Sequence, residues 1–242
     1  MRLTRLYIPT TSLSQEFSAD MHIVLNPDHA HYLLRVLRME NGHQVVLFNE
    51  TCGGWLAVLD VQGKKAIAVL QKQIQTPLVP HNVWMLLAPI KKDAWIFCAE
   101  KMTELGAASL MPVVTEYTQN RIHEDRTKAN MVEASQQCER TDVPLLHASE
   151  KLETMLKKWD GSRVLYAALE RSDAVPAYDA FDVTQPAAIL IGPEGGFSER
   201  EKELLERYDF VRPVSLGAFI LRAETAAIAA LSIWAGKANS RG

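Results

Sequence analysis

Cysteine, excess positive charge and long apolar runs are all scarce in this chain of 242 residues. The three cysteines, Cys52, Cys98 and Cys138, are an odd number with wide spacing, which fits neither a disulfide framework nor a zinc site. The longest apolar run, 83–90, is too short to span a bilayer, and the first residues lack the apolar segment of a secretion signal. These absences predict a cytoplasmic protein in a reducing environment, with no membrane partner.

Several motifs that mark large enzyme classes are also missing. The sequence has no G-x-x-x-x-G-K-[ST], no G-x-G-x-x-G after a strand, no H-E-x-x-H, no G-x-S-x-G and no paired C-x-x-C. We therefore expect neither a P-loop nucleotide site nor a metal site. The net charge of −3 argues against nucleic-acid binding through bulk positive charge, but it leaves room for a local basic patch or the combined surface of an oligomer.

Residues 1–75 have the pattern of a small β-barrel domain. Short β-rich runs (44–48, 55–61 and 66–71) are separated by turn signals, Asn41-Gly42 and Gly53-Gly54 among them. One helix is expected over 28–38. It carries Arg35 and Arg38, which form either a solvated helix face or a patch that contacts RNA phosphates.

From residue 76 onward, after a linker with two prolines (76–81), strands alternate with helices. This order predicts an α/β domain over 76–242, with a mostly parallel sheet and helices on both faces. We expect about five strands, at 83–88, 109–114, 163–169, 187–191 and 211–216. Helices are expected over 93–105, over 126–140, over 149–159 with Ser149 as its cap, after Ser198, and from 222 onward.

Two glycine-containing turns follow the last two predicted strands. The first is Gly192-Pro-Glu-Gly-Gly196, and behind it Ser198 and Glu201 have the spacing of a capping box. Glycines let a ligand approach the backbone closely, although a plain tight turn has the same composition. In an α/β protein the carboxyl ends of the strands are where a ligand binds.

The second turn, 215–222, ends with Arg222 at the start of a long helix. A cation is poorly placed against the dipole there, which indicates a role other than stability. Glu224 and Thr225 suit the dipole in the first turn, so a structural role explains them equally well.

The two turns together resemble the RsmE family of 16S rRNA uridine-N3 methyltransferases, in the SPOUT superfamily. The resemblance lies in Ile191-Gly-Pro-Glu-Gly-Gly-Phe197 and in Ser215-Leu-Gly-x-x-Ile-Leu-Arg-Ala-Glu-Thr-Ala226. Further segments agree in order: His31-x-x-x-Arg35-Val-Leu-Arg38, Lys101-Met-Thr-Glu-Leu-Gly106, Pro112, and Gln137-x-x-Arg140-x-x-x-Pro144. The similarity extends over essentially the whole chain.

The resemblance implies a PUA-like RNA-binding β-barrel followed by a SPOUT domain whose C-terminal part forms a trefoil knot. It also implies a homodimer, with 16S rRNA or the assembled small ribosomal subunit as partner, and S-adenosyl-L-methionine as cofactor. The implied cofactor-binding residues are Ile191, Gly192, Gly195, Gly196, Leu216, Gly217, Ile220, Leu221 and Thr225. Arg222 and Glu224 match the catalytic-side motif of the family, and we expect Glu194 as an alternative proton acceptor. We expect contacts with RNA from Arg35, Arg38, Arg121, Arg126, Lys128 and Arg140.

One helix departs from the family pattern. Where the family has Ala-x-Glu-Gln-x-Gly-Arg, this chain has Gln136 in place of the glutamate and Glu139 in place of the glycine. A charge role for this helix is therefore in doubt. Two other functions stay open from the sequence: another SPOUT reaction such as 2′-O-ribose methylation of rRNA or tRNA, and a non-catalytic RNA-binding ribosome-assembly factor.

Overall fold

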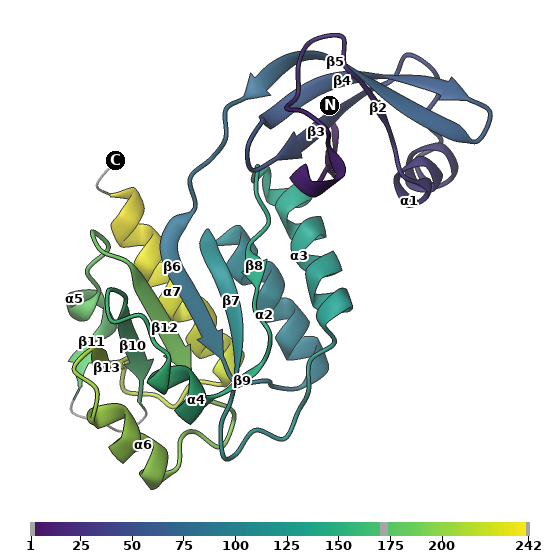
Figure 1. The fold of residues 1–242 in the computed structure, drawn as a ribbon. Coiled ribbons are helices and arrows are strands. Elements are labelled where there is room, and N and C mark those ends of the chain that lie inside the picture. The colour runs from purple at the N-terminus through teal and green to yellow at the C-terminus, as the bar shows by residue number, and fades with distance from the viewer. Residues whose placement is uncertain (1–2, 170–173, 241–242) are drawn as a thin grey trace. The chain divides into compact units, whose positions relative to one another are not determined.

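The computed structural model describes residues 3–169 and 174–240 (Figure 1). The contacts divide them into two compact units. The first unit contains residues up to Val79 together with Ser135–Val143, and the second contains Pro80–Ala134 and the residues from Pro144 onward. Within the described ranges, no helix is both long enough and apolar enough to cross a membrane.

The first unit is a five-stranded sheet with one apolar core. Its strand order is β1-β3-β4-β5-β2; β1 pairs with β3 in parallel, and the other pairs are antiparallel. All five strands contribute to a single buried cluster, to which Leu6, Ile23, Leu47, Leu59 and Leu70 belong. The strands are β1 (Thr4–Tyr7), β2 (His22–Val24), β3 (Gln44–Asn49), β4 (Gly53–Gln62) and β5 (Lys65–Gln75), with a short 3-10 helix at Thr10–Ser12.

The helix expected over 28–38 is shorter and irregular. An α-helix, α1 (Pro27–His31), begins where the Asn26 side chain accepts a hydrogen bond from the His29 N–H. It then widens into a π-helical turn, η2 (Tyr32–Val36), and Arg38 has a left-handed φ of 54°. The chain thus leaves helical geometry before Arg38, and Arg35 and Arg38 do not share one regular helix face.

The segment Ser135–Val143 belongs to the first unit through hydrogen bonds. Gln136 Oε1 accepts the Tyr7 N–H at 3.2 Å, so an amide oxygen supplies the acceptor where the family has a carboxylate. Arg140 is buried, and it bonds Asp142 through both Nε and Nη2, at 2.9 and 2.6 Å. The predicted phosphate contact by Arg140 does not fit this geometry, because its guanidinium is held inside the unit.

The second unit contains an eight-stranded sheet in which every pair is parallel. The strand order is β11-β13-β10-β12-β6-β7-β8, and β9 also pairs with β7. The strands are β6 (His81–Leu87), β7 (Ala107–Val114), β8 (Leu145–Leu146), β9 (Glu150–Lys151), β10 (Val164–Ala168), β11 (Val175–Pro176), β12 (Ala187–Ile191) and β13 (Val211–Ser215). The short strands β8, β9 and β11 were not predicted, because two residues are too few to produce a pattern.

Helices cover both faces of this sheet (Figure 1). On one face, α4 and α6 form a core with Ala188 and Leu190 of β12. The intervening residues of β12 point to the other face, against which α7 packs with α2 beside it. The helices are α2 (Lys92–Glu104), α3 (Glu124–Cys138), α4 (Leu152–Lys157), α5 (Ala177–Ala180), α6 (Glu199–Glu206) and α7 (Ala223–Asn239). The predicted α/β fold with a parallel sheet is confirmed, and the trefoil knot stays a prediction.

The predicted cap at Ser149 is wrong. Residues 150 and 151 form the strand β9, and helix α4 starts behind Lys151 without a side-chain cap. Pairing of β9 with the end of β7 explains the difference, since backbone hydrogen bonds to the sheet hold this segment extended. Ser198, in contrast, makes both bonds of the predicted capping box.

We predict that Glu139→Gly stabilises the protein. Glu139 follows α3 with a φ of 62°, where a side chain costs about 1–2 kcal/mol and glycine costs none. After the larger chain entropy of glycine is subtracted, the gain should be about 0.5–1 kcal/mol in urea unfolding. The control is Glu133→Gly inside α3, which should lose about 1 kcal/mol. Equal losses in both variants would contradict the prediction.

Candidate active site

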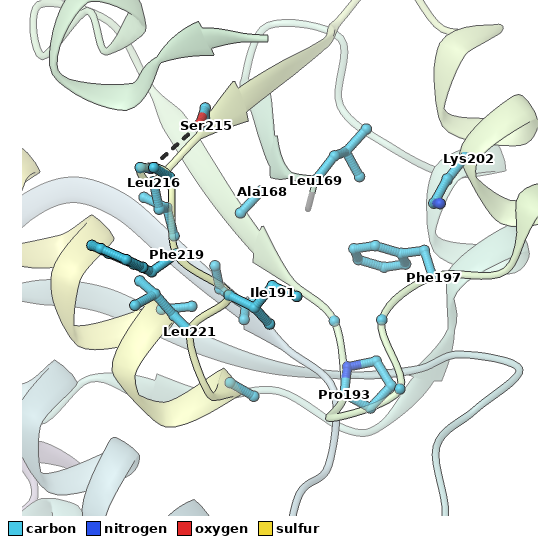
Figure 2. A pocket seen from close by; sticks show the side chains of 18 residues that line it. Ala168, Leu169, Ile191, Pro193, Phe197, Lys202, Ser215, Leu216, Phe219 and Leu221 are labelled. Atoms are coloured by element: carbon cyan, nitrogen blue, oxygen red, sulfur yellow. Dashed lines mark hydrogen bonds between the residues drawn. The ribbon is translucent and has the colours of Figure 1, made fainter. Parts of the chain in front are cut away.

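A cavity of about 640 Å³ lies at the carboxyl edge of the parallel sheet, beyond β10, β12 and β13 (Figure 2). After β10 the chain runs to α5, which contacts α7, whereas after β12 it runs to α6 on the opposite face. Adjacent strands whose connections leave on opposite faces open a crevice between them, which is where open α/β sheets bind ligands. The lining residues are Ala168, Leu169, Ile191, Gly192, Pro193, Gly195, Gly196, Phe197, Lys202, Ser215, Leu216, Gly217, Ala218, Phe219, Ile220, Leu221, Ala223 and Ala226.

The glycine turn after β12 forms the first wall. A Cβ atom on Gly192 would lie 3.1 Å from the Phe197 ring, and one on Gly195 would lie 3.3 Å from Tyr117 Cβ. Gly196 has a φ of 69°, and its N–H donates to the Pro193 carbonyl at 2.9 Å. A side chain would therefore crowd its neighbours at two positions of the turn, and the backbone conformation favours glycine at a third.

A hydrogen-bond network fixes this turn to the loop after β7. The Ser198 hydroxyl accepts the Glu201 N–H at 3.2 Å and donates to Glu116 Oε2 at 2.7 Å. The Glu201 carboxylate accepts the N–H groups of Glu116 and Ser198, at 2.8 and 3.1 Å. Ser198 and Glu201 are both buried, so these bonds hold the loop after β7 and the glycine turn in one arrangement.

The loop after β13 forms the second wall. Gly217 has a φ of 121°, and its N–H donates to Ser215 Oγ at 3.3 Å. Leu216 and Leu221 are partly buried, whereas Phe219 and Ile220 are 87% and 57% exposed although both line the cavity. Figure 2 shows Leu216, Phe219 and Leu221 on one side of the cavity and Phe197 with Lys202 on the other.

All predicted cofactor residues except Thr225 line this cavity. Thr225 is exposed in the first turn of α7. The structure thus brings both motifs to one cavity, and their contacts with a cofactor stay a prediction.

The predicted catalytic side chains stand around the cavity and are not part of its lining. Arg222 is exposed and is the N-cap residue of α7, between the lining residues Leu221 and Ala223. Glu194 is exposed between Pro193 and Gly195 in the glycine turn. Both side chains are thus exposed next to residues that line the cavity.

Glu224 is partly buried in the first turn of α7, near enough to Cys98 of α2 for its charge to act on that thiol. Burial, with a smaller contribution from the charge of Glu224, raises the pKa of the Cys98 thiol to about 12. Cys98 is therefore a protonated core residue and has no nucleophilic character.

Sequence reasoning missed Ala168 and Leu169, at and just after the end of β10, and Phe197 and Lys202, which follow the glycine turn. The other lining residues that it missed lie within or beside the two motifs: Pro193, Ser215, Ala218, Phe219, Ala223 and Ala226. The rule that ligands bind at carboxyl ends of strands could have indicated the first pair. Lys202 carries no such signal, since a lysine in an amphipathic helix is ordinarily a solvated residue.

The predicted RNA-contacting residues fall into two groups. Arg121, Arg126 and Lys128 are exposed in the second unit, in the loop after β7 and the first turns of α3. Arg35 and Arg38 are exposed in the first unit. Arg140 belongs to neither group because it is buried against Asp142. Across residues 3–169 and 174–240, no cluster of His, Cys, Asp and Glu could hold a metal ion.

Comparison with known proteins assigns both units. A family model described as an RNA methyltransferase domain matches residues 77–235, and one described as an RNA methyltransferase PUA domain matches residues 25–71. Fold, cavity and family models thus define an RNA methyltransferase. The sequence is 32% identical to ribosomal RNA small subunit methyltransferase E of Rickettsia conorii, over 96% of this chain and 95% of that protein. The chain belongs to this family, which confirms the resemblance drawn from the two glycine turns.

Solved structures agree with this assignment. The ribosomal RNA small subunit methyltransferase E of Neisseria gonorrhoeae, bound to S-adenosyl methionine, has 26% identity and a TM-score of 0.83 over 96% of each chain. A protein from Legionella pneumophila in complex with the cofactor SAM has 28% identity and a TM-score of 0.86 over 98% of each chain.

We predict that Ser198→Ala destabilises the protein by about 1–2 kcal/mol. The substitution removes the cap of α6 and leaves the Glu116 carboxylate without its hydroxyl partner. The midpoint of urea unfolding should fall with an unchanged slope. The matched control is Ser149→Ala, at the exposed serine that caps no helix, which should change stability by less than about 0.5 kcal/mol. If the two variants were equally stable, the network would not anchor the turn.

Proposed function

We propose that this protein transfers a methyl group from S-adenosyl-L-methionine to N3 of a uridine in the rRNA of the small ribosomal subunit. The observation that carries this proposal is the cavity between the two glycine turns, which unites both family motifs at the carboxyl edge of the sheet. The two similar structures described above were solved with this cofactor, which supports the same ligand here.

The residues of the cavity fit such a cofactor. Its volume of about 640 Å³ lies within the range of small-molecule sites, and apolar side chains alternate with glycine backbone along its walls. Ile191, Leu216, Ile220 and Leu221 would enclose the adenine, whose edge can bond to peptide N–H and C=O groups. Gly192, Gly195, Gly196 and Gly217 allow close approach of the ligand to the backbone, and Thr225 would extend the site at the start of α7.

The bound cofactor supplies an electrophilic methyl group on a sulfonium. Uracil N3 carries a proton at neutral pH, so the protein must hold the base in line and stabilise the loss of that proton. Arg222 is exposed at the cavity edge, where its guanidinium would stabilise negative charge on the uracil carbonyl oxygens. Glu224 or Glu194 would accept the proton. The case for a catalytic role is stronger for Arg222 than for Glu224, since the charge of Glu224 also has a structural explanation: it suits the dipole at the start of the helix.

RNA binding would use the exposed cations of both units. Arg35 and Arg38 would contact phosphates from the PUA-like domain, and Arg121, Arg126 and Lys128 would do so from the methyltransferase domain. We place the boundary between the two domains at 75/76 and infer that the C-terminal part forms a trefoil knot. The substrate would be 16S rRNA or the assembled small subunit, in the cytoplasm.

A homodimer would double these phosphate contacts. The alanines of α7 do not by themselves argue for it, because Ala223, Ala226, Ala227 and Ala230 are buried within their own unit. The outer side of the helix pair α2 and α7 is a more suitable surface for a dimer interface. Phe97 is 45% exposed there, and Ser232 and Gly236 are exposed small residues.

Two alternatives have less support. Methylation of a ribose 2′-oxygen would use the same cofactor, and the family of this chain argues against it. A non-catalytic RNA-binding assembly factor would not need a cavity lined by two glycine turns.

Mapping of rRNA modification tests the proposed reaction. In cells that lack the gene, one uridine of the small-subunit rRNA should lose a strong stop to reverse transcriptase, since N3 methylation blocks the Watson–Crick edge. Restoring the gene should restore the stop. Loss of a 2′-O-methyl group, which blocks the enzyme only weakly, would favour the ribose reaction, and no change in either modification would favour the assembly factor.

Substitutions around the cavity test the proposed catalytic groups. With saturating cofactor, Arg222→Ala should lower the single-turnover rate about 100-fold or more, as loss of one oxyanion-type donor does in other enzymes. Glu224→Gln should lower the rate by about 100-fold if it is the proton acceptor, and Glu194→Gln should do so if Glu194 is. Arg200→Ala, on the exposed side of α6, is the control and should leave the rate unchanged. Wild-type rates for Arg222→Ala would rule out its role.

A further inference from the structure

The cavity contains a marked asymmetry of charge. Of the described residues that line it, Lys202 is the one whose side chain carries a formal charge, and no carboxylate belongs to the lining. The other lining residues are glycine, proline, serine, alanine, leucine, isoleucine and phenylalanine. A ligand with one negative group therefore meets a single matching side chain in the lining.

Lys202 also has a defined place in the cavity. It lies on α6, beside Phe197, which packs over Gly192 in the first wall. The apolar residues Leu216, Phe219 and Leu221 lie on the opposite side (Figure 2). The two ends of the cavity thus differ in chemistry: the α6 end is cationic, and the end formed by the loop after β13 is apolar.

The amine of Lys202 is free to turn toward a ligand. Its partner is Glu199 Oε1 at 2.7 Å, one turn earlier in the same helix, and the Glu199 side chain is 85% exposed. An exposed pair of this spacing contributes only about 0.3–0.5 kcal/mol, so exchanging it for a ligand carboxylate leaves no buried charge behind.

We propose that Lys202 binds the carboxylate of the amino-acid tail of the methyl donor, and so sets the direction in which the cofactor lies in the cavity. This inference rests on the proposed function for the identity of the ligand. The tail carries the only negative group of the cofactor, while its sulfonium and ammonium groups are positive. Lys202 therefore attracts the carboxylate and disfavours the opposite orientation, in which the amino-acid tail would lie among apolar residues; the uncharged adenine then lies against residues 216–221 at the other end.

Calorimetry with two ligands tests this assignment. S-adenosylhomocysteine keeps the amino-acid tail, whereas methylthioadenosine has the same adenosine and sulfur without the tail. Lys202→Met should weaken binding of S-adenosylhomocysteine about tenfold or more, because one charge-assisted hydrogen bond is lost. Binding of methylthioadenosine should change less than about twofold. Lys202→Arg keeps the charge and should retain most of the affinity for S-adenosylhomocysteine.

A matched control removes a charge elsewhere on the same helix. The Arg200 side chain is 82% exposed and does not line the cavity, so Arg200→Met should leave both affinities unchanged. An equal loss in Arg200→Met and Lys202→Met, an equal loss for both ligands, or no loss in Lys202→Met would each overturn the assignment. If the wild-type protein bound neither ligand, the proposed function itself would fail, which separates the two outcomes.

Discussion

The candidate site depends on how a turn of glycines is held in one shape. Glycine lets the backbone approach a ligand, but it contributes no side chain that could keep the turn in place. The bonds among Ser198, Glu201 and Glu116, buried between the first two and partly buried at Glu116, supply that support. Because Glu116 comes from the loop after β7, the shape of the first wall is set jointly by two segments far apart in the sequence.

The second wall is built on a different principle. The loop after β13 has fewer internal bonds, and its apolar side chains Phe219 and Ile220 are largely exposed. Polar hydrogen bonds therefore hold the first wall, the glycine turn after β12, in place. The second wall, the loop after β13, presents apolar surface that a ligand or a partner could cover.

Much of the fold was predictable because its signals are local. The strand at 187–191 and the capping box at Ser198 each depend on a pattern of a few adjacent residues, and the structure confirms both. The errors have non-local causes. Ser149 has the residue type and position expected of a helix cap. Residues 150 and 151, however, pair with the end of β7 and form a strand. Near Arg38, the chain leaves helical geometry and the next residue, Met39, packs against the core of the first unit, a contact that the local sequence does not signal.

The same division applies to the site. The glycine motifs identified eight of the eighteen lining residues because close backbone approach demands a particular residue type at a particular position. Lys202 was not predicted as a lining residue, since nothing in its own helix distinguishes it from a solvated lysine. The burial of Arg140 was also not predicted, because the sequence does not distinguish an arginine that meets RNA from one that is paired with Asp142. Residue types indicate which side chains could bind a ligand, and only the contacts show which of them already have a partner within the protein.

The placement of Ser135–Val143 in the first unit has a consequence for how this protein can be divided. The N-terminal sheet takes an acceptor for the Tyr7 N–H from Gln136 and bonds Arg5 to the Arg140 carbonyl, both from a stretch that lies after β7 in the chain. A cut in the linker would leave these groups on opposite products. The first unit is thus discontinuous in the gene, and recombination at the linker could not transfer it intact to another enzyme.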